Sequence, residues 1–364
     1  MAAIAILAAS CNNLDETPAV TDGELTPLTF SIESFKGTTK AAETNESNYA
    51  TQITSFGVLG YFDASTTGVT GAAAGQRYLG SSDTSPVQID GSAGNYTYHN
   101  AADMVMWPAT TAPLNFQAFT PISGGGIGEV ENTVSNNLPH LAVNVVVPTD
   151  NASQKDIMFA QALAQTSATN NKVVKMPFVH AMSAIRFSAK TTASSISAKI
   201  KNVTIANVVS TGKVGYLTDK TLGSSLGSAR ASYSIGMKSA SVDVGTTSVD
   251  LTATDGSCIL LPQTLTKWVP SAGTAVTTET ANSYLIVECM VIQNGVYLVG
   301  DGTNYGKVYV PFNATWEQGK KYTYTINIGS GSGGYDANGN PLLAPISFSA
   351  SAANWTDSSG SVTF

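Results

Sequence analysis

The chain has 364 residues, of which only 12% are charged, and its formal net charge at pH 7 is −7. This length allows two or three domains, each with a core of its own. The only arginines are Arg77, Arg186 and Arg230, and no basic stripe could neutralise a run of phosphates, which argues against nucleic acid as a partner. Ser, Thr, Gly, Asn and Val take the place of charged residues, and this composition predicts an all-β fold with turn-rich connections.

The first residues resemble a bacterial lipoprotein signal. Met1 to Ser10 is an apolar run, too short to span a bilayer, that ends in small residues directly before Cys11. We therefore expect residues 1–10 to be the signal, Cys11 to carry a lipid anchor and residues 11–26 to be a tether. Ala8 stands where such signals usually have Leu, and no basic segment precedes the run. A frayed apolar N-terminus is the alternative.

The first predicted strand follows this tether. Leu28, Phe30 and Ile32 alternate with polar residues, which is the period of a half-buried strand. A polar stretch then runs from Gly37 to Thr51, with Lys36 and Lys40 at its near side. This pattern predicts an exposed loop.

The rest of the chain continues as short apolar runs between turns. The predicted strands before residue 172 are 53–62, 96–99, 105–107, 114–119, 141–147 and 157–164, and those after it are 178–190, 200–209, 214–217, 242–251, 258–261, 284–292, 296–299, 308–312, 322–328 and 346–349. Asn294-Gly295 between two apolar runs predicts a type I′ hairpin. Only 156–165 and 178–188 compete as helices. The polar stretch near residue 172 predicts two tandem antiparallel β-sandwiches, residues 27–172 and 173–364.

Candidate catalytic and metal sites are few. His99, His140 and His180 share no spacing typical of metal ligands, and His180 stands between apolar neighbours, as a structural histidine does. Asp336 to Asn340 begins like a calcium loop, but Pro341 occupies the position that needs glycine, so we expect a turn. No serine stands in a nucleophile elbow. We therefore expect neither an enzyme nor a metal or other cofactor.

Two further cysteines, Cys258 and Cys289, lie in apolar runs. We favour the interpretation that both are buried free thiols, and a disulfide between them is the alternative.

Several segments taken together resemble the fimbrillin family of Bacteroidetes, which supplies the subunits and accessory proteins of pili. They occur in order along nearly the whole chain and are Ala8 to Cys11, Phe30 to Ala41, Lys155 to Ala160, Pro177 to Phe187, Trp316 to Ile326, and Ile346 to Phe348 followed by Trp355. The resemblance implies transthyretin-like β-sandwich domains and a lipid-anchored protein of the outer membrane or fimbrium.

The resemblance also implies a mode of assembly. A trypsin-like surface protease would remove the first strand, residues 27–36 with Leu28, Phe30 and Ile32, by cleavage after Lys40 or, as second choice, Lys36. A C-terminal strand of a neighbouring subunit would fill the groove. In this chain the donor is expected in residues 349–364, where Val362 and Phe364 alternate with polar residues. Lys40 departs from the arginine that is commonly cut in the family. A host or bacterial receptor is a further expected partner.

Two other classes of protein compete with a fibre subunit. A monomeric glycan-binding or adhesive surface lipoprotein would present aromatic side chains, and of Trp107, Trp268, Trp316 and Trp355 only Trp268 is expected in a loop. A glycoside hydrolase would need two carboxylates facing each other across a cleft, and no pair in the sequence suggests one.

Overall fold

The structure is a computed structural model that describes residues 26–32, 53–63, 75–92, 95–109, 112–135, 138–218, 221–278, 282–331, 333–355 and 362–363. Nearly all regular structure in these ranges is β-strand, which confirms the all-β prediction. The described helices are single 3-10 turns, namely η2 (Ala101–Asp103), η3 (Asn151–Ser153), η4 (Thr169–Lys172) and η5 (Val276–Thr278). The two segments that compete as helices in the sequence are strands.

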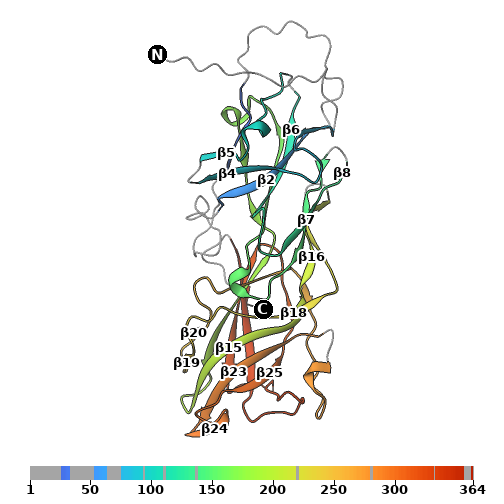
Figure 1. The fold of residues 1–364 in the computed structure, drawn as a ribbon. Coiled ribbons are helices and arrows are strands. Elements are labelled where there is room, and N and C mark those ends of the chain that lie inside the picture. Colours follow the sequence, from blue (N-terminus) through green and yellow to red (C-terminus); the bar gives the residue numbers. More distant parts are fainter. Residues whose placement is uncertain are drawn as a thin grey trace.

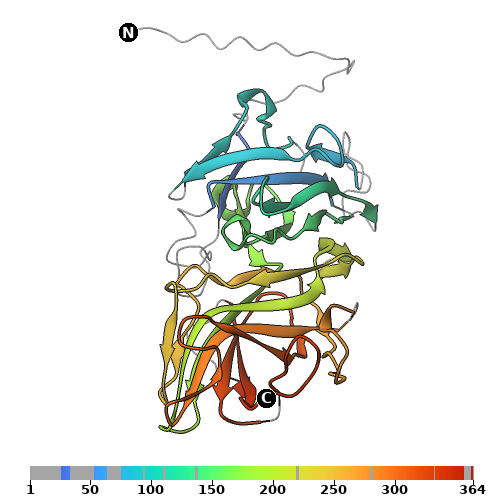
Figure 2. The ribbon, with the colours of Figure 1, turned by 60° about the horizontal axis from the view of Figure 1, so that its bottom comes forward.

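The molecule is elongated, with the first half of the chain at one end and the second half at the other (Figures 1 and 2). The first half forms a seven-stranded sheet whose central strands are buried on both faces. Its order is β13 (Val179–His180), β11 (Met158–Gln165), β6 (Leu114–Thr120), β2 (Ser55–Phe62), β4 (Val87–Ser92) and β5 (Asn95–Tyr98), with β3 (Arg77–Leu79) also paired to β2.

Two six-stranded sheets form the other end. The first has the order β20 (Val249–Asp250), β14 (Ser183–Thr191), β27 (Lys320–Ile328), β28 (Ile346–Asn354) and β29 (Val362–Thr363), with β21 (Cys258–Leu260) on β14. The second has the order β18 (Arg230–Ser234), β15 (Ile196–Val209), β23 (Tyr284–Gln293) and β24 (Val296–Val299), with β19 (Val242–Val244) on β15 and β25 (Gly306–Pro311) on β23.

A four-stranded sheet joins the halves, because it takes two strands from each. Its order is β17 (Thr221–Leu226), β16 (Thr211–Thr218), β10 (Ala142–Val146) and β7 (Ile127–Glu131). Three small ribbons complete the fold: β1 (Thr29–Ile32) with β12 (Val173–Met176), β22 (Thr264–Leu265) with β26 (Ala314–Thr315), and β8 (Val134–Ser135) with β9 (Leu138–Pro139). Most pairings are antiparallel, but β1–β12 and β14–β27 are parallel.

Buried apolar side chains form two clusters. The small core belongs to the first half and includes Leu28, Phe30, Ile32, Phe56, Phe116, Val174, Met176 and Phe178. The large core fills the second half and extends into the first through Leu59, Tyr61, Phe119, Leu141, Val143, Ile157 and Phe159. Residues 173–178, which we assigned to the second domain, thus pack in the small core. The division near residue 172 and the transthyretin-like topology stay predictions.

One turn shows how closely local sequence dictates structure here. Asn294 and Gly295 have φ angles of 49° and 82°, both in the left-handed region that a type I′ turn requires, and they join the antiparallel strands β23 and β24. The predicted hairpin is confirmed.

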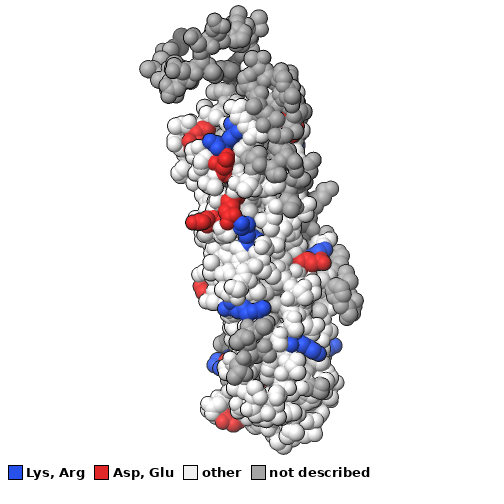
Figure 3. All heavy atoms as spheres, turned by 90° about the vertical axis from the view of Figure 1, so that its right-hand side faces the viewer, with Lys and Arg blue, Asp and Glu red and all other residues white. Residues whose placement is uncertain are grey.

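The surface has few charges. On the face drawn in Figure 3, Lys, Arg, Asp and Glu are scattered among a majority of uncharged residues and form no extended stripe of one sign. This agrees with the low charged fraction of the sequence.

Candidate functional site

The first described strand is held at both of its ends. At its start, the Leu28 amide donates to the Val105 carbonyl at 2.9 Å and the Trp107 amide donates to the Thr26 carbonyl at 2.8 Å. From Thr29 onward the strand pairs in parallel with β12, ending with Ile32 opposite Met176. Only four residues take part in this ladder, so side-chain burial must supply most of the strand's binding energy.

That burial follows the period seen in the sequence. Leu28, Phe30 and Ile32 are 0, 4 and 8% exposed, while Thr29 and Ser31 are half-buried. The predicted half-buried strand is therefore present, with its apolar face in the small core.

Phe30 is the central anchor of this strand. Its ring makes edge-to-face contacts with Phe116 and Phe56, at centroid distances of 5.5 and 6.2 Å, and a third with Tyr98 at 6.4 Å. The Tyr98 hydroxyl also donates to the Leu28 carbonyl at 2.9 Å. A cavity of about 210 Å³ lies next to Phe30 and Tyr98 and is lined almost wholly by apolar atoms. The strand is therefore well anchored but leaves unfilled space beside it.

The C-terminal edge of the fold is built differently. β28 pairs with β27 over nine positions, from Lys320–Asn354 to Ile328–Ile346, whereas β29 pairs with β28 only at Ser351–Thr363 and Ala352–Val362. Beside β28 lies an open groove of about 740 Å³, lined by Tyr322, Tyr324, Phe348 and the small side chains of Ala350 and Ala352. Residues 349–354 of the expected donor segment thus belong to a long strand, and the backbone of 362–363 caps its edge.

Several residues predicted from the sequence fall outside the described ranges. Cys11, Lys36, Lys40 and Phe364 are among them, so lipidation, processing and part of the donor segment stay predictions. Val362 is described only through the backbone pairing of β29.

The sequence candidates for a calcium loop and for an exposed tryptophan make structural contacts in this fold. Within the described ranges, no group of three His, Cys, Asp or Glu residues could hold a metal ion. Asp336 closes a turn, since its carboxylate accepts the amides of Asn338 and Asn340 at 2.8 and 2.9 Å. Trp268 is only 4% exposed and packs on Tyr284 and Tyr335, so it does not present its ring to a glycan.

His180 takes part in a buried polar contact that joins distant parts of the chain. Its Nδ1 lies 2.7 Å from Oδ2 of Asp156, and the two side chains are 1 and 3% exposed. The imidazole stacks on Trp355 with a centroid distance of 4.2 Å and an interplanar angle of 6°. The Trp355 amide donates to the Gly319 carbonyl at 2.8 Å. The end of β28 is thereby fixed to the segment that precedes β11.

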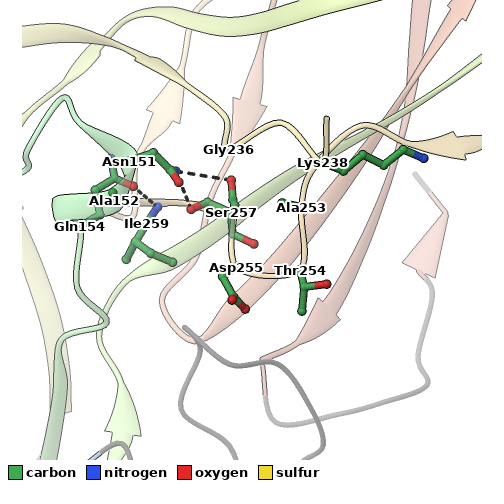
Figure 4. A pocket seen from close by; sticks show the side chains of 11 residues that line it. Asn151, Ala152, Gln154, Gly236, Lys238, Ala253, Thr254, Asp255, Ser257 and Ile259 are labelled. Atoms are coloured by element: carbon green, nitrogen blue, oxygen red, sulfur yellow. Dashed lines mark hydrogen bonds between the residues drawn. The ribbon is translucent and has the colours of Figure 1, made fainter. Parts of the chain in front are cut away.

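A second contact between the halves lies in a pocket of about 620 Å³ (Figure 4). The Asn151 side chain, in η3, donates to the Ser257 carbonyl at 2.9 Å. The Gln154 Oε1 accepts the Ile259 amide at 2.8 Å. Gly236 and Gly256 approach so closely that a Cβ on Gly256 would lie 2.1 Å from the Gly236 carbonyl oxygen. These contacts connect the loop after β10 to the loop before β21.

The remaining cysteines are free thiols. Cys258 and Cys289 are both buried, and burial raises the pKa of each thiol to about 12. In a Cys11→Ser background, we expect no reaction of native protein with Ellman's reagent at pH 8, because neither thiolate is populated or accessible. In denaturant, two thiols per chain should react. Rapid reaction of native protein would contradict this, and the absence of thiols after unfolding would reveal a disulfide.

In the part of the chain that is described, no helix has the length and apolar character that crossing a membrane requires. The features described above are two strand edges, two contacts that join the halves and several surface grooves.

Comparison with known proteins fits this picture. The model of the family described as Fimbrillin-like matches residues 26–355. A fimbrial protein of known crystal structure from Bacteroides vulgatus shares the fold, with a TM-score of 0.52 and 14% identity over 82% of this chain and 92% of that one. A protein named for cell adhesion from Bacteroides uniformis gives a TM-score of 0.47 and 12% identity over 90% and 98% of the two chains. None of the curated proteins compared matches the sequence. Because the family match spans most of the chain, the protein belongs to the Fimbrillin-like family.

Proposed function

We propose that this chain is a subunit of a surface fibre that assembles by strand exchange. Membership of a family of fimbrial and cell adhesion proteins supports a role at the cell surface in contact with other subunits. The observation that carries the finer proposal is the segment from Leu28 to Ile32. It has three buried anchors, and its strand β1 forms a ladder with only one other short strand, β12.

The energetics of β1 suit an exchangeable strand. Full burial of Leu28, Phe30 and Ile32 contributes about 1.5 to 3 kcal/mol for each side chain. While β1 is part of the chain, its high effective concentration keeps competing strands out of the groove. Cleavage after Lys40, or Lys36, would turn residues 27–36 into a separate ligand, which a neighbour's strand of similar pattern could displace.

The neighbour's donor is the segment after Trp355. The nine-position pairing of β28 with β27 would have to break before residues 349–354 could be donated. β29 is held by only two paired positions, so its release costs far less. We therefore assign the donor role to Val362, Phe364 and the residues around them.

Anchoring completes the proposal. A lipid on Cys11 would hold the precursor at the outer membrane, with residues 12–26 as a tether. A trypsin-like protease at the surface would then start assembly, and the finished fibre would meet a host or bacterial receptor. Metabolic labelling with a fatty acid, compared between wild type and Cys11→Ala, tests the anchor.

The first test of this proposal concerns processing of the precursor. Brief treatment of purified precursor with trypsin should produce a new N-terminus at Ala41, followed by polymers. The double variant Lys36→Gln, Lys40→Gln should stay uncut at this loop and monomeric, because β1 remains tethered to its groove. N-terminal sequencing and size-exclusion chromatography measure the two outcomes. Polymers formed by the uncut double variant would refute the mechanism.

A second prediction concerns the tail. Deleting residues 361–364 removes all of β29. The deletion should abolish polymers and leave the melting temperature unchanged, because β29 pairs with only two residues of β28. The same deletion in the uncut double variant serves as a folding control. A large drop in melting temperature would instead assign the tail to the subunit's own fold, and the chain would then end a fibre without extending it.

A further inference from the structure

An open groove of about 640 Å³ lies on the second six-stranded sheet, at the end of the molecule where Figure 1 labels β24. The strand register builds its floor. Asp243 of β19 lies opposite Lys199 of β15, which lies opposite Met290 of β23. Two residues further along β23, Ile292 lies opposite Tyr297 of β24. Opposed residues on neighbouring strands share a face, so four strands contribute to one surface.

This surface is the outer face of the sheet. The alternate residues of β23, among them Cys289 and Val291, are buried in the large core. Met290 and Ile292 on the other face are only partly covered. Beside Lys199 and Asp243, the floor of the groove therefore carries an apolar patch that is accessible from solvent.

Tyr297 gives the groove an aromatic wall. It is 43% exposed, and among the described residues it is the only aromatic in the set of large apolar side chains that are clearly exposed. The four tryptophans are all at 5% exposure or less. Tyr297 is thus more accessible for stacking on a ligand than any of the tryptophans.

The Tyr297 ring lies close to the loop that follows β24 and leads to β25. Gly302 has a φ angle of +87°, and a Cβ there would lie 2.8 Å from the Tyr297 hydroxyl oxygen. Asp301 closes the loop by accepting the amides of Thr303 and Asn304 at 3.0 and 2.7 Å. A ring packed against a closed loop loses little conformational freedom when a ligand binds, which favours binding.

The rim supplies polar groups without net charge. Lys199 Nζ lies 3.3 Å from Asp243 Oδ1; the Asp243 side chain is largely in solvent, and that of Lys199 is partly covered. Thr303 and Ser197 also line the groove. Tyr305 lines the far wall, and Lys201 Nζ lies 5.5 Å from the centre of its ring.

We propose that this groove binds a neutral glycan. The apolar face of one sugar ring would pack against Tyr297 above the floor of Met290 and Ile292, and its hydroxyl groups would bond to Lys199 and Asp243. Small-ligand sites of about 300 to 1,000 Å³ combine apolar contact surface with convergent polar groups, and this groove offers both kinds of surface. The balanced ion pair favours a neutral sugar over an acidic one.

An extended peptide suits this groove less well. Strand addition needs an unpaired backbone edge, whereas β15 and β23, which form the middle of the floor, are paired on both sides. A glycan needs only side-chain contacts from the face of the sheet.

The test is saturation-transfer NMR on the full-length chain with lactose, N-acetyllactosamine, maltose, cellobiose, chitobiose and α-mannobiose, and with sialyllactose as the acidic comparison. We expect at least one neutral disaccharide to bind. Tyr297→Ala should weaken that sugar about tenfold or more. Tyr297→Phe, which keeps the ring, and Val296→Ala, a clearly exposed neighbour, should bind as the wild type does.

A second variant keeps the test decisive if Tyr297→Ala does not fold. Asp243→Ala removes a rim acceptor from an exposed position and should weaken the same sugar with an unchanged melting temperature. The proposal is overturned if no neutral disaccharide binds, if Tyr297→Ala binds the sugar as well as the wild type does, or if sialyllactose binds more tightly than every neutral sugar. It is also overturned if Tyr297→Ala alters only the association of chains in analytical ultracentrifugation, which would make the groove a contact between subunits.

Discussion

Replacing Phe30 with alanine should lower the free energy of unfolding of the uncut protein by about 3 to 5 kcal/mol, the usual cost of truncating a buried phenylalanine. Phe30 is 4% exposed and contacts three aromatic rings of the small core. A pocket already lies beside Phe30, and the truncation would enlarge it. Urea denaturation of Phe30→Ala in the Lys36→Gln, Lys40→Gln background gives the value.

Ser31→Ala is the matched control for this measurement. It lies in the same strand, is only half-buried and projects to the opposite side, so its loss should be small. Hydrogen exchange should show the extra opening of Phe30→Ala in β1 and β12. A loss as small as that of Ser31→Ala would mean that β1 contributes little to the precursor, and the need for its cleavage would disappear.

The second large effect is expected at the buried contact of Asp156 with His180. Asp156→Val should cost about 3 to 5 kcal/mol of unfolding free energy, because truncating one partner of a buried polar pair in close contact is strongly destabilising. The double variant Asp156→Val, His180→Phe should be more stable than Asp156→Val alone. The phenyl ring keeps the stack on Trp355 and replaces the polar ring that Asp156 contacts in the wild type.

An exposed ion pair provides the comparison. Glu288 lies 2.9 Å from Lys201 on the outer face of the second sheet, and Glu288→Gln should have a much smaller effect because exposed pairs contribute little. Guanidinium denaturation of wild type, Asp156→Val, His180→Phe and the double variant completes the double-mutant cycle. If the double variant is less stable than either single variant, the contact is not a coupled pair.

The sequence predicted local features well. Alternation of Leu28, Phe30 and Ile32 with polar residues sufficed to find β1, and Asn294-Gly295 sufficed for the hairpin. Both depend on neighbours in the chain, through the side-chain period of a strand and the backbone preference of two turn residues.

What the sequence left open depends on contacts between distant segments. The parallel partner of β1 is β12, more than 140 residues away, and no local pattern identifies it. Trp268 has the polar neighbours typical of a loop, yet Tyr284 and Tyr335 cover it. The groove at Tyr297 was missed for the same reason, since its floor comes from three other strands. The sequence indicated that His180 is structural, but it did not identify its partners Asp156 and Trp355.

Strands of the first half pair with strands of the second half within one chain, and this pairing determines which fragments of the protein can fold. A chain cut at residue 172 would separate β1 from β12, β11 from β13 and β10 from β16, and would divide the large core between two pieces. Each piece would expose unpaired strand edges and apolar side chains, which is the condition for aggregation. Residues 138–218 must therefore stay together in any truncated form that is meant to remain soluble, and limited proteolysis of the intact protein should spare this region.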